Sequence, residues 1–178
     1  MTPIPELHTE RLTLRAFRAE DLDAFASINA DPAFMQHLGN GLPRTREETW
    51  AQMESALGQW ALRGYGLFAV ETNGTFAGRV GIFQPADWAE PELAWGLGPA
   101  FWGAGLATEA AAAARDWAFD RFGWTEVASF IRPENSRSRR VAEKLGATVS
   151  GTTMLRGGSV KRWAHRRAIA PGDTPWSK

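Results

Sequence analysis

Residues 99–110 of the 178-residue chain read PAFWGAGLATEA, and the fold that we predict is built outward from this stretch. The apolar run before it, residues 92–97, predicts a strand, and the alanine-rich run that ends near Phe122 predicts a helix. The free N–H groups in the first turn of a helix bind anions, and Gly103 and Gly105 let the backbone approach a ligand closely. The same sequence is also compatible with a strand-to-helix turn that needs glycine only for its dihedral angles.

The composition indicates one globular domain over residues 1–178. Hydrophobic residues make up 44% of the chain and charged residues 22%, a balance ordinary for a domain with a sizeable core. The formal net charge is zero, which argues against nucleic acid as a partner. The sequence has no apolar run long enough to span a membrane and no signal-peptide pattern. We therefore expect a cytoplasmic protein without a membrane partner.

The residue types also exclude several chemistries. The chain has no cysteine, so disulfides, thiolate metal ligands and a cysteine nucleophile are excluded. His8, His37 and His165 lie far apart without metal-ligand spacing, so we expect no metal. No Gly-Lys pair marks a P-loop, no Gly-x-Ser-x-Gly motif marks a serine elbow, and the third glycine of a dinucleotide motif is missing. A glycine turn alone in mid-chain suggests one pyrophosphate, held by backbone amides.

Hydrophobic spacing and turn residues predict an α+β domain with a mixed, mostly antiparallel sheet of about seven strands and about four helices. The expected strands are residues 11–17, 66–71, 77–83, 92–97, 126–132, 148–154 and 160–169. The expected helices are residues 20–29, 45–63, the segment from the glycine turn to residue 122, and 136–145. We expect residues 1–9 to be an irregular lead-in, residues 34–43 a loop and residues 171–178 a frayed tail.

The helix at residues 45–63 has the clearest local signals. Thr45 and Glu48 have the form of a capping box, and Gly64 stands where a C-terminal glycine belongs. One stripe of this helix carries Trp50, Met53, Leu57 and Trp60. A core role for this stripe is favoured over a pocket wall because large apolar residues at helical spacing are usually buried. After the helix, Asn73-Gly74 marks a hairpin turn.

A second motif occupies residues 132–146, which read RPENSRSRRVAEKLG. Asn135 or Ser136 is placed to cap a short helix, and this capping role is the reading that the residues alone favour. The arginines at positions 137, 139 and 140 are then solvated, although they could also attract a phosphate.

Taken together, these motifs resemble the GNAT N-acetyltransferase superfamily. Residues 101–110 resemble its acyl-coenzyme A loop, and a later segment of the superfamily is matched by Asn135, Ser138, Val141, Glu143, Lys144, Leu145 and Gly146. The opening TERLTLR at residues 9–15 and EDL at residues 20–22 are similar to the Rim-type branch, which acetylates the N-termini of ribosomal proteins. The three matches stand in the right order, and their joint occurrence is far more specific than any one of them.

The resemblance implies an acetyl-CoA site. Backbone N–H groups of Trp102, Gly103, Ala104, Gly105, Leu106, Ala107 and Thr108 would hold the pyrophosphate. The strand edge from Trp95 to Leu97 would pair with the pantetheine arm like an added strand, and a splay between this strand and residues 126–132 would admit the arm. Asn135 would contact the pantetheine or hold the helix that does. Trp102 and Ala104 depart from the superfamily, which often has polar or basic residues there, so less charge supports the pyrophosphate.

The implied chemistry is acyl transfer from a thioester to a primary amine in a ternary complex. The resemblance assigns the base that deprotonates the amine to Glu92 and the acid that protonates the leaving thiolate to Ser138. Glu92 could instead be a solvated strand end, and Ser138 an ordinary first-turn serine. Glu90 is a second candidate base, whereas we expect Glu109 to support the first helical turn.

The acceptor amine is the least determined partner. The resemblance places its site at residues 34–65 with Trp88, where no cluster of acids indicates a polyamine or aminoglycoside. The N-terminal amine of a protein or peptide is the first choice, by branch resemblance, and a small-molecule amine is the alternative. A non-catalytic acyl-CoA-binding module is the competing class of function. Sheet edges and exposed aromatic residues would allow a homodimer.

Overall fold

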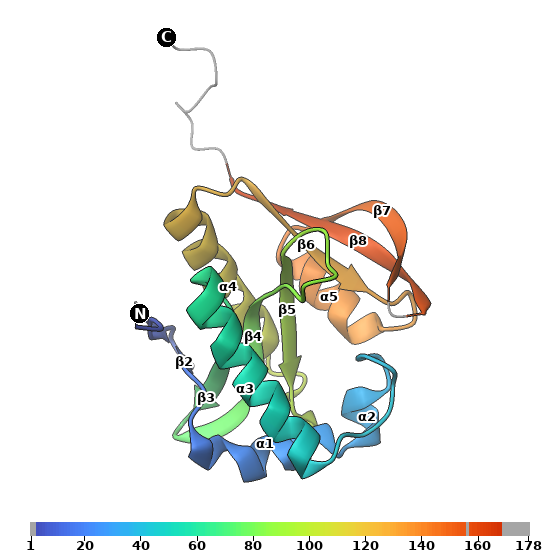
Figure 1. Cartoon of the computed structure of the whole chain (residues 1–178). Helices are drawn as coiled ribbons and strands as arrows, with labels where there is room; N and C mark the ends of the chain where they lie inside the picture. Colours follow the sequence, from blue (N-terminus) through green and yellow to red (C-terminus); the bar gives the residue numbers. More distant parts are fainter. Residues whose placement is uncertain (1–2, 156, 169–178) are drawn as a thin grey trace.

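The computed structural model describes residues 3–155 and 157–168, and there the chain forms one eight-stranded sheet covered by helices (Figure 1). The strands are β1 (Leu7–His8), β2 (Thr13–Arg15), β3 (Leu67–Thr72), β4 (Thr75–Phe83), β5 (Glu92–Leu97), β6 (Glu126–Ile131), β7 (Thr148–Leu155) and β8 (Gly158–Arg166). The helices are α1 (Leu22–Asn29), α2 (Pro32–Met35), α3 (Arg46–Arg63), α4 (Leu106–Phe122) and α5 (Ser136–Lys144), and the 3-10 turns are η1 (Ala19–Asp21) and η2 (Pro99–Phe101). The α+β class is confirmed. The expected tail at 171–178 and the end of the last expected strand lie outside the described residues.

The sheet is mostly antiparallel, in the order β1-β2-β3-β4-β5-β6-β8-β7. Its parallel pair is β5–β6, and in the described chain these strands share a single register pair, Glu92 with Ala128. On its other edge β5 pairs with β4 along its whole length, from Glu92 to Leu97. The strands β5 and β6 therefore diverge after their first contact, and the splay expected before the glycine loop is confirmed.

Two apolar clusters fix the helices on opposite faces of the sheet. Small residues of α4 let it lie close to the strands, and this cluster contains Ala110, Ala111, Ala114, Val80, Ile82 and Leu93. The opposite face is covered by α1 and α3, in a cluster that contains Phe25, Met53, Ala56, Leu67 and Ala69. Figure 1 shows α3 in front of the sheet and α4 behind it. The glycine turn before α4 is thereby held at one end of β5.

Two short elements in the N-terminal third were not predicted. Leu7 and His8 pair with β2 as the strand β1, although we expected residues 1–9 to be irregular. A two-residue strand is too short to show an alternating pattern. The helix α2 lies next to the proline at which we expected the preceding helix to stop. Asp31 caps α2 by accepting from the N–H groups of Ala33 and Phe34, and Pro32 suits a first helical position.

The helix α3 confirms its predicted ends and half of its predicted core stripe. Thr45 and Glu48 form the capping box, and Gly64 closes the helix with a φ of 74°. The buried side chains are Thr49, Met53, Ala56 and Trp60, whereas Trp50 and Leu57 are 40% and 38% exposed. The core face therefore runs through a threonine. Its hydroxyl is satisfied inside the protein, because it donates to the carbonyl of Thr45.

The opening motif contains a buried arginine. Arg15 is 6% exposed, and its guanidinium donates to both carboxylate oxygens of Asp21, at 2.8 and 2.7 Å. Its Nε donates to Glu71 on the neighbouring strand β3 at 2.9 Å. These hydrogen bonds, chiefly those to Asp21, raise the pKa of Arg15, so it stays charged. The spacing between TERLTLR and EDL thus reflects an ion pair that joins β2 to η1.

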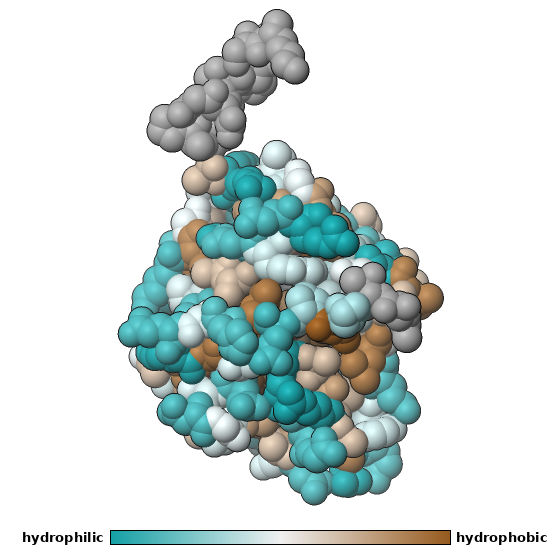
Figure 2. All heavy atoms as spheres, turned by 90° about the vertical axis from the view of Figure 1, so that its left-hand side faces the viewer, coloured by the Kyte–Doolittle hydropathy of each residue, from teal (hydrophilic) through white to brown (hydrophobic). Residues whose placement is uncertain are grey.

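Figure 2 shows the molecule from the left-hand side of Figure 1, where hydrophilic residues dominate and hydrophobic residues stand in small groups between them. Among the described residues, the large hydrophobic side chains that are exposed include Leu62, Val149 and Met154. The last two belong to β7, the edge strand of the sheet. Single exposed apolar residues are normal on a soluble domain, and the homodimer stays a prediction.

Candidate active site

The glycine turn has the backbone geometry that an anion site needs. Gly103 and Gly105 have φ angles of 82° and 79°, in the left-handed region that favours glycine. Gly105 is the N-cap of α4 and supplies no side-chain cap. Within the described chain, the N–H groups from Gly103 to Thr108 have no recorded acceptor. The first turn of α4 therefore presents unpaired donors and the positive end of the helix dipole.

Trp102 contributes differently from what we expected. Its backbone N–H donates to the carbonyl of Pro99 at 3.2 Å, so this amide is not one of the unpaired donors of the glycine turn. Its indole Nε1 donates to the carbonyl of Leu97 on β5 at 2.6 Å, and the guanidinium of Arg137 lies over its ring at 3.7 Å. Trp102 therefore links the glycine turn to β5 and to the start of α5.

The free edge of β5 offers one position for an extended ligand. Ser129 of β6 donates its hydroxyl to the carbonyl of Leu93 at 2.6 Å, and Trp102 covers the carbonyl of Leu97. Backbone groups of alternate residues point to the same edge of a strand, so those of Trp95 also face the splay. Of the edge predicted to pair with pantetheine, only the backbone around Trp95 is left to bind a ligand within the described chain, because the carbonyls of Leu93 and Leu97 already accept hydrogen bonds.

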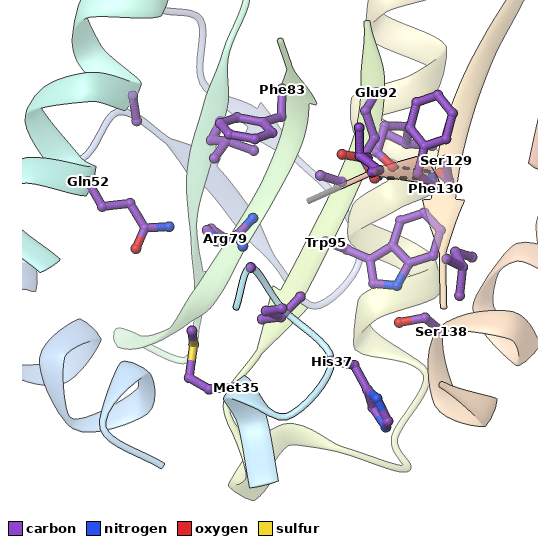
Figure 3. A pocket seen from close by; sticks show the side chains of 18 of the residues that line it. Met35, His37, Gln52, Arg79, Phe83, Glu92, Trp95, Ser129, Phe130 and Ser138 are labelled. Carbon is purple, nitrogen blue, oxygen red and sulfur yellow. Dashed lines mark hydrogen bonds between the residues drawn. The ribbon is translucent and has the colours of Figure 1, made fainter. Parts of the chain in front are cut away.

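A cavity of about 460 Å³ opens where β5 and β6 diverge (Figure 3). It is lined from several elements by residues that include His37, Gln52, Arg79, Glu92, Trp95 and Ser138. The region that we expected to contain the acceptor site supplies one wall, and Trp88 also lines the cavity. Among the described residues, the charged side chains of the lining are Arg44, Arg79 and Arg132 with Glu48 and Glu92.

Glu92 stands at the root of the splay and is not a solvated strand end. Its side chain is buried, with 9% exposure, and lines the cavity. One carboxylate oxygen accepts from the N–H of Phe130 on β6 at 3.1 Å, across the gap between the strands (Figure 3). A buried carboxylate on the cavity wall has the placement of a general base, and the same hydrogen bond ties β6 to β5.

Ser138 and Asn135 meet at the start of α5 and both line the cavity. The side-chain oxygen of Asn135 accepts from the N–H of Ser138 at 3.1 Å, which confirms that Asn135 caps this helix. Among the described residues, the Ser138 hydroxyl has no recorded hydrogen-bond partner. Figure 3 shows Ser138 next to Trp95, which lies between Ser138 and Glu92 in this view. A hydroxyl placed there can donate a proton to a group bound between β5 and β6.

The other two acids that the sequence singled out, Glu90 and Glu109, form hydrogen bonds with residues outside the cavity lining. Both oxygens of Glu90 accept from Arg162, at 2.8 and 2.7 Å, and these hydrogen bonds lower the pKa of Glu90. A weakened base held by an arginine outside the cavity lining is a poor candidate for catalysis. Glu109 does lie in the first turn of α4, but its carboxylate also binds Thr9 and Arg11, nearly a hundred residues away in sequence.

His37 and Arg79 are cavity residues that the sequence did not single out. Burial, and then the charge of Arg137, lowers the pKa of His37, so its imidazole is neutral at neutral pH. Arg79 lies on β4, where an arginine in an apolar strand was the signal available in the sequence. Neither residue has a spacing that would have predicted a place in the site, because the fold brings them there.

His165 lies on β8 and contacts Ser129 of β6 beside the splay. It is 1% exposed, and its Nε2 lies 2.9 Å from the hydroxyl of Ser129. Because that hydroxyl donates to the Leu93 carbonyl, the imidazole Nε2 must carry a proton and donate to it. Burial lowers the pKa of His165 to about 4. The neutral histidine therefore holds Ser129 in the orientation in which its hydroxyl donates to the Leu93 carbonyl of β5.

No group of three or more histidine, aspartate or glutamate side chains with the geometry of a metal site occurs among the described residues. None of the helices in the described part of the chain is both long enough and apolar enough to cross a membrane.

The family follows from comparison with known proteins. The model of the acetyltransferase (GNAT) domain family matches residues 11–148, a range that includes the glycine turn, Glu92 and Ser138. The chain belongs to this family of acetyl-CoA-dependent acetyltransferases. It is similar to the uncharacterized N-acetyltransferase p20 of Bacillus licheniformis, with 28% identity over 151 residues, which cover 82% of this chain and 83% of that protein.

Solved structures agree with the fold. The acetyltransferase from Agrobacterium tumefaciens strain C58 is 31% identical, with a TM-score of 0.82, and the match covers 94% of this chain and 97% of that one. The ribosomal L7/L12 α-N-protein acetyltransferase RimL in complex with coenzyme A has a TM-score of 0.76 at 19% identity, over 91% of this chain and 98% of that one. At such identity the likeness supports the fold alone, so the Rim-type branch stays a prediction.

Proposed function

We propose that the enzyme transfers the acetyl group of acetyl-CoA to a primary amine by direct attack, with Glu92 as general base and Ser138 as general acid. The observation that supports this proposal is one shared cavity. It contains a buried carboxylate and a hydroxyl on its walls, and it opens at the splay of β5 and β6. The open amides before α4 lie at the end of β5, where they would hold the pyrophosphate.

In this mechanism Glu92 takes a proton from the bound ammonium, directly or through a water, and leaves a neutral amine. The amine nitrogen attacks the thioester carbonyl carbon, and backbone N–H groups at the splay stabilise the developing oxyanion. The C–S bond then breaks as the amide forms. The hydroxyl of Ser138 gives its proton to the thiolate of coenzyme A and receives the second proton of the nitrogen, directly or through a water, so Ser138 ends the step neutral. Glu92 releases the first proton to solvent. The pantetheine arm lies along Trp95, and Asn135 holds the turn of α5 that carries Ser138.

For the acceptor we put first the N-terminal amine of a peptide or protein, and a small-molecule amine is the alternative. A cavity of about 460 Å³ has the size of a small-molecule site, so it fits a small amine or the first residues of a peptide. The walls formed by the described residues contain three arginines and two glutamates, a balance that disfavours a polycationic acceptor such as a polyamine.

The test is acetyl transfer measured across a panel of peptide N-termini, small primary amines and one polyamine. Glu92→Gln keeps an oxygen that can accept from the N–H of Phe130 but removes the base, so we expect a loss of about 10²–10⁴ in kcat. Glu90→Gln is the matched control and should retain most of the activity. Ser138→Ala should lose less than Glu92→Gln, because a thiolate leaves readily, and Ser136→Ala controls for a serine in the same turn.

Two results would contradict the proposal. If Glu92→Gln keeps the activity of the wild type on the best acceptor, Glu92 only ties β6 to β5. If the wild type binds acetyl-CoA but acetylates no amine of the panel, the chain acts as an acyl-CoA-binding module and the catalytic assignment fails.

A further inference from the structure

The N-terminal segment is bound to the first turn of α4 by a compact set of hydrogen bonds. Glu109 accepts from the Thr9 hydroxyl at 2.6 Å and from the Arg11 backbone N–H at 3.0 Å with one carboxylate oxygen. Its other oxygen accepts from Arg11 Nε at 2.7 Å and lies 2.6 Å from Arg11 Nη2. The remaining guanidinium nitrogen, Nη1, donates to the carbonyl of Ala104 at 2.8 Å. Arg11 therefore connects Glu109 to the glycine turn.

The contact with Ala104 determines where the next amide points. In a planar trans peptide the C=O and the N–H lie on opposite sides, so a carbonyl held by Arg11 directs the following N–H away from Arg11. That N–H belongs to Gly105, the N-cap of α4 and a member of the open donor set. Gly105 has a φ of 79° and no Cβ, and Arg11 Nη2 is the nearest atom to the position that a Cβ would take, at 3.7 Å. Arg11 thus orients the peptide between Ala104 and Gly105.

The charge of Arg11 is balanced in place. Burial by itself would raise the pKa of Glu109, but the hydrogen bonds from Thr9 and Arg11 lower it, so the carboxylate is ionised beside the guanidinium. A paired arginine adds little net positive charge to the turn, although the polar or basic side chains that the resemblance implies are missing at Trp102 and Ala104. The contribution of Arg11 to the site is therefore geometric.

We propose that Arg11 and Glu109 are positioning residues for the pyrophosphate of acetyl-CoA, because they lock the Ala104–Gly105 peptide with its N–H toward the anion. The inference rests on the proposed binding of pyrophosphate at the glycine turn. It assigns a role in the cofactor site to the TERL segment, which the sequence places far from that site. It also explains why an acidic side chain is tolerated beside an anion-binding helix end.

The experiment compares the wild type with Arg11→Met, which keeps a long apolar side chain but removes every donor. Binding of coenzyme A is measured by calorimetry, and inhibition of acetyl transfer is measured with inorganic pyrophosphate and with pantetheine, which lacks the pyrophosphate. Arg46→Met is the matched control, because Arg46 forms an exposed ion pair with Asp23 on the opposite side of the sheet. Arg11→Lys is included because one ammonium cannot serve both Ala104 and Glu109.

We expect Arg11→Met to weaken coenzyme A and pyrophosphate about tenfold each, the effect of one misdirected hydrogen bond to a charged ligand. Inhibition by pantetheine and kcat at saturating acetyl-CoA should stay within twofold of the wild type. The affinities of Arg11→Lys for coenzyme A and pyrophosphate should lie between those of the wild type and Arg11→Met. Arg46→Met should match the wild type.

Equal binding of coenzyme A by Arg11→Met and the wild type overturns the inference. So does an equal weakening of pantetheine and pyrophosphate, which would mean that Arg11 only stabilises the fold. If the wild type itself binds neither coenzyme A nor pyrophosphate, the failure lies in the proposed function, and this result is distinguishable from the other two.

Discussion

Protonation of His165 should destabilise the protein in acid, and the size of the effect follows from its burial. His165 is 1% exposed and donates through Nε2 to Ser129, which covers the Leu93 carbonyl at the splay. Its other ring nitrogen, Nδ1, is also buried and has no hydrogen-bond partner within the described chain. A second proton would add a buried charge there, and burial accordingly lowers the pKa to about 4 from an ordinary value of 6.5.

The sign follows from proton linkage. Between pH 6.5 and pH 4 the unfolded chain binds a proton at this histidine and the folded chain does not. The free energy of unfolding therefore falls as the pH falls through this window, and the contribution is fully present above pH 6.5. A pKa difference of about 2.5 units corresponds to about 3 kcal/mol, which is the largest loss that His165 can cause.

The assay is urea unfolding of the wild type and His165→Gln between pH 7.5 and pH 4. Glutamine can still donate to Ser129 but does not titrate, so its stability curve should be flatter by about 3 kcal/mol over this range. The control is His8→Gln, which changes a histidine whose side chain is 66% exposed and should follow the wild type at every pH. If the stability difference between the wild type and His165→Gln is constant with pH, the buried neutral histidine is refuted.

Three other substitutions have definite expected outcomes. Asp21→Asn leaves the buried guanidinium of Arg15 without its main partner, and chemical unfolding should show a loss of about 3–5 kcal/mol. Trp60→Phe removes the buried indole donor to the Leu67 carbonyl and should cost about 1–3 kcal/mol in the same assay. Gly103→Ala meets no atom within 4 Å but is strained at its φ of 82°, so it should cost about 1–2 kcal/mol. An unchanged unfolding midpoint would contradict the ion pair or hydrogen bond on which the first two predictions depend, or the backbone strain on which the third depends.

The sequence predicted best where the signal is local. The capping box of Thr45 and Glu48, the glycine at position 64 and the strand at residues 92–97 are all found as expected. Each of these signals depends on the chemistry of a few neighbouring residues, which the fold does not change. The glycine turn and Glu92 could be located as well, because the turn has a distinctive sequence and the resemblance places the acid at the start of the preceding strand.

What the sequence could not predict depends on contacts between distant residues. Two of the four residues predicted for the α3 stripe are exposed, because the buried face runs through Thr49, whose hydroxyl is satisfied within the helix. The bond of Arg11 to Glu109 spans 98 positions, and no local pattern pairs them. His37 enters the cavity because its loop is held there, with Arg132 donating to the carbonyl of Gly39 at 3.0 Å. Such placements follow from packing and register, which periodicity alone does not determine.

The central claim is that the glycine turn before α4 binds acetyl-CoA for transfer to an amine. The most direct test is calorimetric titration of the purified protein with acetyl-CoA, repeated with Gly105→Glu. Gly123→Glu is the matched control, since Gly123 also has a left-handed φ and open space around it but closes the far end of the same helix. We expect the wild type and Gly123→Glu to bind acetyl-CoA and Gly105→Glu not to bind it. Equal binding by all three proteins, or no binding by the folded wild type, would contradict this claim.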